Sequence, residues 1–226
     1  LGMLLHYEGE FQKSNLLIHE AFEVGNMIED DINNKRVKTR LLVLLSLNYF
    51  LMDSTELAVK YSGLSLEYAK KYNYIDLMFD PLRISAINYF LKGNYKLALE
   101  YLEQSSNIAQ EINDNNNKFM VKVLYAEYYM VVGDLKISQN IIEELIKLTN
   151  PKDLEMGGLL DLKARTELIK GNYDISREIY YNSKQILVKY NDLICIEIIN
   201  CEFGYTYLLQ NNYLKALEYF NNNLFE

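Results

Sequence analysis

Apolar and polar positions alternate in a pattern that recurs about every 40 residues along the chain. It is clearest in the segments 90–101, 130–138, 168–177 and 208–219, where apolar residues come shortly before a Gly-Asn, Gly-Asp or Asn-Asn pair. Internal repeats of this length are typical of stacked helical hairpins. With the glycine as the anchor, six repeats align, and their anchors are Gly9, Asp53, Gly93, Gly133, Gly171 and Asn211.

Small residues occupy two fixed positions in each repeat, seven before and five after the anchor. Gly, Ala and Ser make up only 30 of the 226 residues, yet they fill all twelve of these positions. Large residues, mostly Tyr, lie four before and two after the anchor. The small positions are Gly2, Ser46, Ala86, Ala126, Ala164 and Gly204 before the anchor, and Ser14, Ala58, Ala98, Ser138, Ser176 and Ala216 after it.

This pattern predicts a pair of antiparallel helices in each repeat, with the anchor ending the first helix. Small residues let two helices approach closely, and Gly or Asn ends a helix because it adopts positive φ at little cost. Asp53 fits least well, so we expect a looser turn there. We also expect Asp80 to cap a helix that begins at Pro81. Polar stretches separate the hairpins at 30–34, 113–117, 150–153 and 191–192.

The small positions, the tyrosines and the Gly-Asn-Tyr turn resemble the tetratricopeptide repeat family over essentially the whole chain. The resemblance implies an all-α, right-handed superhelix of about six stacked antiparallel hairpins, forming one domain over residues 1–226. Trp is absent, the proline that closes each unit is mostly missing, and the period is near 40 instead of 34. This longer variant is similar to the repeats of bacterial signalling proteins and of peptide-sensing transcription regulators.

Composition and charge exclude several other classes of protein. A net charge of −8 disfavours nucleic-acid binding, which needs clustered Lys and Arg. The longest apolar stretch, 41–52, is shorter than the ~20 residues of a spanning helix. No signal peptide opens the chain, so we expect no membrane contact and a cytoplasmic location. The chain begins in the middle of the pattern and without an initiator Met, so we expect a fragment of a longer protein.

The residues that catalysis or metal binding requires do not converge in this sequence. His6 and His19 lack the spacing of a zinc site, and Gly157-Gly158 lacks the Lys-Ser or Lys-Thr of a phosphate loop. We therefore expect no enzyme activity, no cofactor and no metal. Cys195 and Cys201 are six residues apart on one expected helix, so their side chains point apart and we expect no disulfide.

The first helices of the hairpins are expected to line a concave surface. Side chains three, six and ten residues before the anchor share one stripe of that surface. The stripe is mostly apolar with a central band of charge, which suits an amphipathic helix or an extended peptide. Two interpretations compete with this one: these side chains are half-buried between helices, or Asp161 and Arg165 support their own helix as an i,i+4 pair. The candidate groove residues are Phe50, Arg83, Ile87, Asn88, Phe90, Glu127, Met130, Asp161, Arg165 and Tyr205.

The resemblance sharpens the expected partner. Asn48 and Asn88 are similar in type to the asparagines that grip peptide backbones in peptide-sensing regulators. The Lys and Asn clamp for a C-terminal carboxylate is replaced by pairs such as Arg83 with Ile87. We expect a non-catalytic sensor or interaction module of a bacterial signalling or transcription regulator, whose groove binds a peptide or protein segment. The alternatives are a scaffold that forms homodimers through its end repeats and a regulatory repeat region fused to a catalytic signalling domain.

Overall fold

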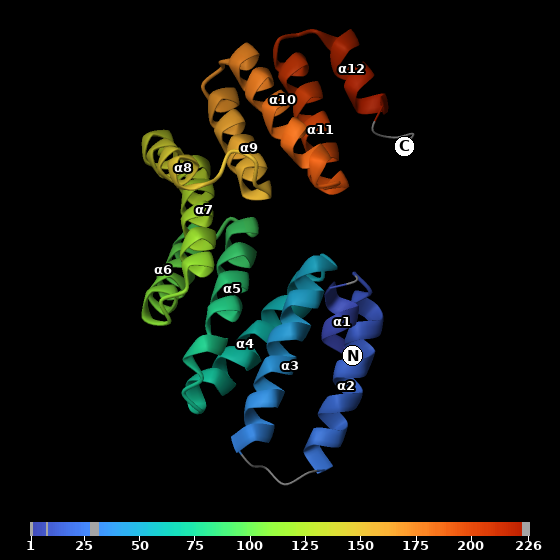
Figure 1. The fold of residues 1–226 in the computed structure, drawn as a ribbon, viewed down its shortest axis with the longest axis vertical. Helices are drawn as coiled ribbons and strands as arrows, with labels where there is room; N and C mark the ends of the chain where they lie inside the picture. Colours follow the sequence, from blue (N-terminus) through green and yellow to red (C-terminus); the bar gives the residue numbers. More distant parts are fainter. Residues whose placement is uncertain (1, 8, 28–31, 223–226) are drawn as a thin grey trace. The chain divides into compact units, whose positions relative to one another are not determined.

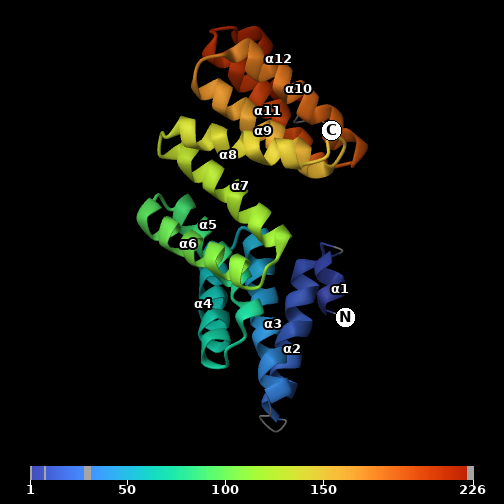
Figure 2. The ribbon, with the colours of Figure 1, turned by 60° about the vertical axis from the view of Figure 1, so that its left-hand side comes forward.

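The computed structural model describes residues 2–7, 9–27 and 32–222, and every regular element in these ranges is a helix. Figures 1 and 2 show the helices in chain order, each running back along the one before it within a hairpin. They are α1 (Gly2–Tyr7), α2 (Phe11–Met27), α3 (Ile32–Leu51), α4 (Thr55–Lys71), the short 3-10 helix η1 (Ile75–Leu77), α5 (Phe79–Leu91), α6 (Tyr95–Glu111), α7 (Asn115–Val131), α8 (Leu135–Leu148), α9 (Leu154–Ile169), α10 (Tyr173–Lys189), α11 (Leu193–Leu209) and α12 (Tyr213–Asn222).

The helices form two compact units, Leu1–Val121 and Lys122–Glu226, with the boundary inside α7. In each unit, consecutive helices pack as antiparallel hairpins, such as α3 with α4 and α9 with α10. The all-α hairpin fold that the sequence predicts is thus present in both units. The assembly of all six repeats into one superhelical domain stays a prediction.

The six anchors all end their first helix in the left-handed region of the backbone, with φ between 55° and 90°. Asp53 forms the same turn as Gly93, because the amide of the next residue bonds back to the Tyr49 carbonyl at 2.8 Å and to the Tyr89 carbonyl at 2.9 Å, respectively. The looser turn expected at Asp53 is therefore wrong. Asp is among the few residues besides Gly that adopt αL readily, so Asp in place of Gly at this anchor costs little free energy.

The small positions hold the two helices of each hairpin together, as the sequence predicts. All of them are buried except Gly2, which is half-buried. Where the position five after the anchor is Ser, its hydroxyl donates across the hairpin to the carbonyl of the small residue seven before the anchor, at 2.8 Å in each case. These bonds run from Ser14 to Gly2, from Ser138 to Ala126 and from Ser176 to Ala164.

Tyrosines close the hairpins beside these small positions. A Tyr four before the anchor stacks on a Tyr eight after it, with ring centroids 5.3–5.6 Å apart. Stacked rings add to the stability that burial alone provides. The pairs are Tyr49 with Tyr61, Tyr89 with Tyr101, and Tyr207 with Tyr219.

Helix α5 begins earlier than the sequence predicts. The helix begins at Phe79, two residues before the predicted Pro81, and η1 precedes it, so Asp80 lies in the first turn and not at the cap. Pro81 fits there because the first four amides of a helix need no partner within it. The breaker at 113–117 is also shorter than predicted, since α7 already begins at Asn115. Residues 30 and 31 of the first breaker lie outside the described ranges.

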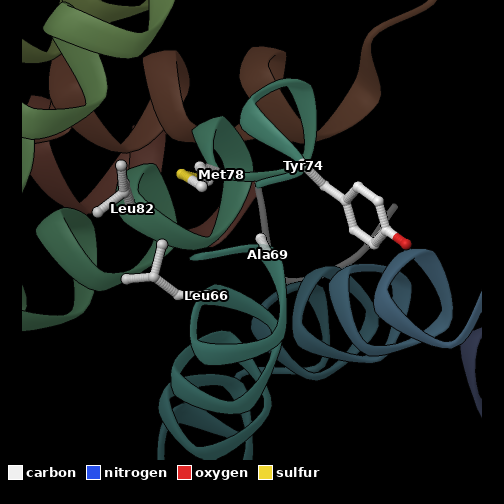
Figure 3. Close-up of a cluster of buried hydrophobic side chains, with 5 residues drawn as sticks. All are labelled: Leu66, Ala69, Tyr74, Met78 and Leu82. Atoms are coloured by element: carbon white, nitrogen blue, oxygen red, sulfur yellow. The ribbon is translucent and has the colours of Figure 1, made fainter. Parts of the chain in front are cut away.

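Between α4 and α5, the core is built from Leu66, Met78 and Leu82, which lie side by side in Figure 3. The Tyr74 ring points the other way, toward α3, where the guanidinium of Arg36 lies 5.2 Å from the ring centroid. This cluster joins two neighbouring hairpins of the first unit.

Candidate functional site

The predicted groove residues of the first unit lie on α3 and α5. Phe50, Ile87 and Phe90 are half-buried, and the Phe90 ring meets the Tyr95 ring edge-on at 5.7 Å. Arg83 forms an ion pair of 3.0 Å with Asp80 on its own helix. These residues remain accessible in part, and a role in ligand binding stays a prediction for them.

Asn88 is placed differently, because only 1% of it is exposed. Its Nδ2 donates to the Ile84 carbonyl at 2.9 Å, while its Oδ1 is buried without a hydrogen-bond partner. The sequence alone did not distinguish this inward position from the predicted groove surface, since Asn88 directly follows Ile87, which belongs to the predicted stripe.

Asn48, the matching residue of the preceding repeat, is also fully buried. It donates to Ser14 Oγ at 2.9 Å and to Asn15 Oδ1 at 2.7 Å, and its Oδ1 lies 2.5 Å from Nδ1 of His6. This network links α1, α2 and α3. The Asn48 amide is therefore already hydrogen-bonded within the protein and is not free to bind a peptide backbone, the role that the resemblance suggested for it.

In the second unit, the structure brings Glu127, Asp161 and Arg165 together from α7 and α9. Arg165 Nη2 lies 3.0 Å from Asp161 Oδ2, one turn earlier on the same helix. Glu127 interacts electrostatically with both. The i,i+4 pair that was an alternative interpretation is therefore present, and it belongs to a larger charged cluster.

The other two predicted residues of this unit differ in burial. Met130 is 8% exposed and packs with Ala126, Ile142 and Leu162, so it belongs to the core. Tyr205 on α11 is 45% exposed and therefore open to a partner.

Glu202 on α11 is the member of the cluster that the sequence reasoning missed. Its charge acts on Asp161, Arg165 and Tyr180. The signal was in the repeat: nine residues before the anchor, where Glu202 stands, the other repeats carry Leu or Ile. These residues are Leu44, Ile84, Leu124 and Leu162.

We use the name charged cluster for Glu127, Asp161, Arg165 and Glu202, in which three carboxylates surround one guanidinium. Burial raises the pKa of Asp161 to about 6; Arg165 opposes this rise and Glu202 adds to it. Burial likewise raises the pKa of Glu127. Burial alone would lower the pKa of Arg165, but the surrounding carboxylates outweigh burial and raise it, so Arg165 stays charged.

A pocket of about 70 Å³ lies beside the charged cluster. Asp161 and Arg165 form its polar wall, and the apolar wall comes from α10 and α11. The apolar lining is Leu187, Cys195, Ile198 and Ile199. A volume of this size holds more than one water molecule, so the pocket has room for a small functional group.

Buried polar atoms around this pocket lack partners. Asp161 Oδ1 and Arg165 Nε are buried without a hydrogen bond from the described residues. The Tyr180 side chain is fully buried and its hydroxyl faces the charged cluster without a well-formed hydrogen bond, and burial raises its pKa. Buried polar groups are normally hydrogen-bonded, so the Asp161 and Arg165 atoms, whose residues line the pocket, mark the place where a ligand group is accommodated most easily.

The thiol beside the pocket is not activated. Burial raises the pKa of Cys195 to about 11, and the Asp192 carboxylate adds to this rise. A thiol with such a pKa is protonated at neutral pH and is a poor nucleophile. Cys195 and Cys201 do not form a disulfide. In the part of the chain that the structure describes, no group of three or more His, Cys, Asp or Glu is placed to hold a metal ion.

Comparisons with known proteins agree with this fold. No family model matches the chain and no curated protein matches it in sequence. Solved structures do match. The aspartyl phosphate phosphatase F from Bacillus subtilis has a TM-score of 0.74 at 16% identity over 98% of this chain and 56% of that one.

Two further structures match at a similar level. The Rap conjugation gene regulator of the plasmid pLS20, in complex with the Phr* peptide, gives 0.72 at 12% identity over 98% of this chain and 61% of that one. A signal transduction ATPase from Pyrococcus horikoshii with a tetratricopeptide repeat sensor gives 0.68 at 16% identity over 96% of this chain and 33% of that one. The chain thus spans less than two thirds of each of these three proteins and has the tetratricopeptide-repeat fold that its sequence predicts.

Proposed function

We propose that this chain is a non-catalytic, cytoplasmic binding module, in which the surface formed by the first helices of the hairpins binds a peptide or an extended protein segment. The observation that carries this proposal is the pocket between α9 and α11, which has apolar walls, a charged cluster and buried polar atoms without partners. A peptide offers apolar side chains together with amide groups that satisfy such atoms.

The likeness to a regulator in complex with the Phr* peptide supports the same proposal, since a fold of this type holds a peptide in that protein. We further propose that the parent protein is a bacterial signalling or transcription regulator. No helix in the described ranges is long and apolar enough to span a bilayer.

The proposal that the chain itself is not an enzyme is supported by the protonated state of Cys195. One similar structure is called a phosphatase, so hydrolysis of an aspartyl phosphate is the activity to test. A rate above the uncatalysed background, abolished by a substitution within the chain, would contradict this part of the proposal.

The binding proposal is tested by thermal unfolding of the chain with a library of short peptides, because a ligand that binds only the folded state raises the melting temperature. We expect hits whose effect is lost in Tyr205→Ala, on exposed α11. Tyr181→Ala is the matched control, because Tyr181 is also an exposed tyrosine, 57% against 45% for Tyr205, and lies on α10, the second helix of its hairpin. A library without a single hit, or hits that Tyr181→Ala weakens as strongly, would contradict the proposal.

A second candidate function is self-association through α12. Leu214 is 85% exposed, and Tyr213 and Leu217 are exposed beside it. Apolar side chains this exposed on one helix favour a protein neighbour. Sedimentation at increasing concentration tests this candidate. We expect dimers that Leu214→Lys dissociates; a chain that stays monomeric at high concentration would eliminate it.

A further inference from the structure

We infer that the pocket between α9 and α11 binds a primary ammonium group on a short aliphatic stem, such as a lysine side chain of a bound peptide or a small alkylamine. This inference gives a ligand chemistry to the surface assigned above, and its peptide form rests on that assignment.

The sign of the charge follows from the composition of the charged cluster. Three carboxylates, Glu127, Asp161 and Glu202, share one guanidinium, so the cluster has an excess of negative charge when all groups are ionised. Arg165 already balances its charge in the ion pair that its Nη2 forms with Asp161, and only its Nε is buried without a hydrogen-bond partner among the described residues. A second cation is therefore the group that this site lacks.

The buried carboxylate oxygen specifies a hydrogen-bond donor. Asp161 Oδ1 is buried without a hydrogen-bond partner among the described residues, and Asp161 lines the pocket. A carboxylate only accepts hydrogen bonds. An ammonium group brings three donors on one compact centre, whereas a planar guanidinium needs a wider opening. A pocket of about 70 Å³ fits the smaller head better.

The apolar wall specifies the stem. Leu187, Ile198 and Ile199 line the pocket together with Asp161 and Arg165. Lysine side chains and alkylamines bury methylene groups against such a wall while the charged end reaches a polar one. A metal cation would gain nothing from that wall.

Glu202 offers a substitution that removes charge without harming the repeat. Leu or Ile occupies the same repeat position in four other repeats, Glu202 is only half-buried, and Arg165 keeps Asp161 as its ion-pair partner when Glu202 is replaced. Glu202→Leu is therefore expected to fold. The control is Glu178→Gln, which removes one negative charge from an exposed site on α10.

The experiment titrates the chain with n-butylammonium and with n-butanol by NMR at fixed ionic strength. The same measurement compares capped peptides that carry lysine or norleucine at one position. We expect n-butylammonium to bind at least about tenfold more tightly than n-butanol, since charge-assisted bonds are the stronger ones. Glu202→Leu is expected to remove this preference, and Glu178→Gln to keep it.

The outcomes separate the two sources of the ammonium group and the two proposals. Preference for both n-butylammonium and the lysine peptides supports the inference with a peptide as the source. Preference for n-butylammonium while no peptide binds supports the ammonium site with a free amine as the source, and counts against the peptide-binding function. Peptide binding that is indifferent to lysine, together with equal binding of n-butylammonium and n-butanol, overturns the inference and leaves the binding function intact. An ammonium preference that survives Glu202→Leu also overturns it.

Discussion

In the first unit, the buried polar side chains of the first helices include the neutral amides Asn48 and Asn88, whereas in the second unit Asp161 and Arg165 carry charge next to a pocket. The hairpin scaffold is the same in both units, with small residues at the same positions and the same αL turn at each anchor. The spacing of the small residues around each anchor is shared by the repeats and builds the scaffold. The residues between these small positions determine the chemistry of each unit.

The largest expected effect tests the amide network of the first unit. Asn48→Leu removes the partner of Ser14 and Asn15 and leaves buried polar groups unsatisfied. We expect a loss of about 3 kcal/mol in the free energy of unfolding, because each such orphaned group costs about 1–3 kcal/mol. Urea denaturation measures it.

The control for this prediction is Asn88→Leu at the same repeat position. Asn88 bonds only within its own helix and already has an unpartnered Oδ1. We therefore expect a change below about 1 kcal/mol. Equal losses in the two variants would show that burial of an amide at this position, and not the network, determines the cost.

The second effect concerns the charged cluster of the second unit. Arg165→Leu leaves Glu127, Asp161 and Glu202 without their shared cation. Removing one partner of a buried pair typically costs about 3–5 kcal/mol, and because the Arg165 side chain is 31% exposed, we expect about 2 kcal/mol at pH 7. Urea unfolding at pH 7 and at pH 5 should show a smaller loss at the lower pH, where Asp161, with a pKa of about 6, is mostly protonated.

Arg83→Leu is the matched change in the first unit. Arg83 pairs with Asp80 across one turn of its helix, and the Asp80 side chain is 38% exposed, whereas Asp161 is only 14% exposed. Ion pairs with an exposed partner contribute about 0.2–1 kcal/mol. A loss as large as that in Arg165→Leu would contradict the distinction between the two units.

A comparable effect is the pH dependence that Asp161 gives to stability. Its pKa rises from 3.8 to about 6 on folding, so between these values the folded chain holds a proton that the unfolded chain has released. Stability therefore decreases as the pH rises from about 4 to 6, and Asp161→Asn removes this slope. We expect the difference between the two chains to change by about 2 kcal/mol over this range, measured by urea unfolding at several pH values.

The groups that face Asp161 from the neighbouring helices are Glu127 of α7, Arg165 of its own helix, Tyr180 of α10, and Cys195 and Glu202 of α11. Parallel pH profiles of the wild type and Asp161→Asn would show that another of these groups takes up the proton.

The sequence predicted the hairpins well because their determinants are local and repeated. A Gly or Asn anchor, a small residue seven before it and another five after it are enough to specify the helix pair, as the hydrogen bond from Ser176 to the Ala164 carbonyl illustrates. Prediction was poorer for single polar residues. Asn88 and Arg83 both lie on α5, yet Asn88 is fully buried while Arg83 is half-buried.

The sequence by itself determined the helical hairpins, the turn at each anchor and the close contact between paired helices, since each depends on residues within about twenty positions of one another. Three features are visible only in the tertiary structure: Glu202 lies with Asp161 and Arg165, Asn48 is hydrogen-bonded within a buried network, and a pocket opens beside the charged cluster. The physical reason is that these contacts join helices of different repeats, where the residue type sets the possible interaction and the packing of neighbouring helices sets whether it forms.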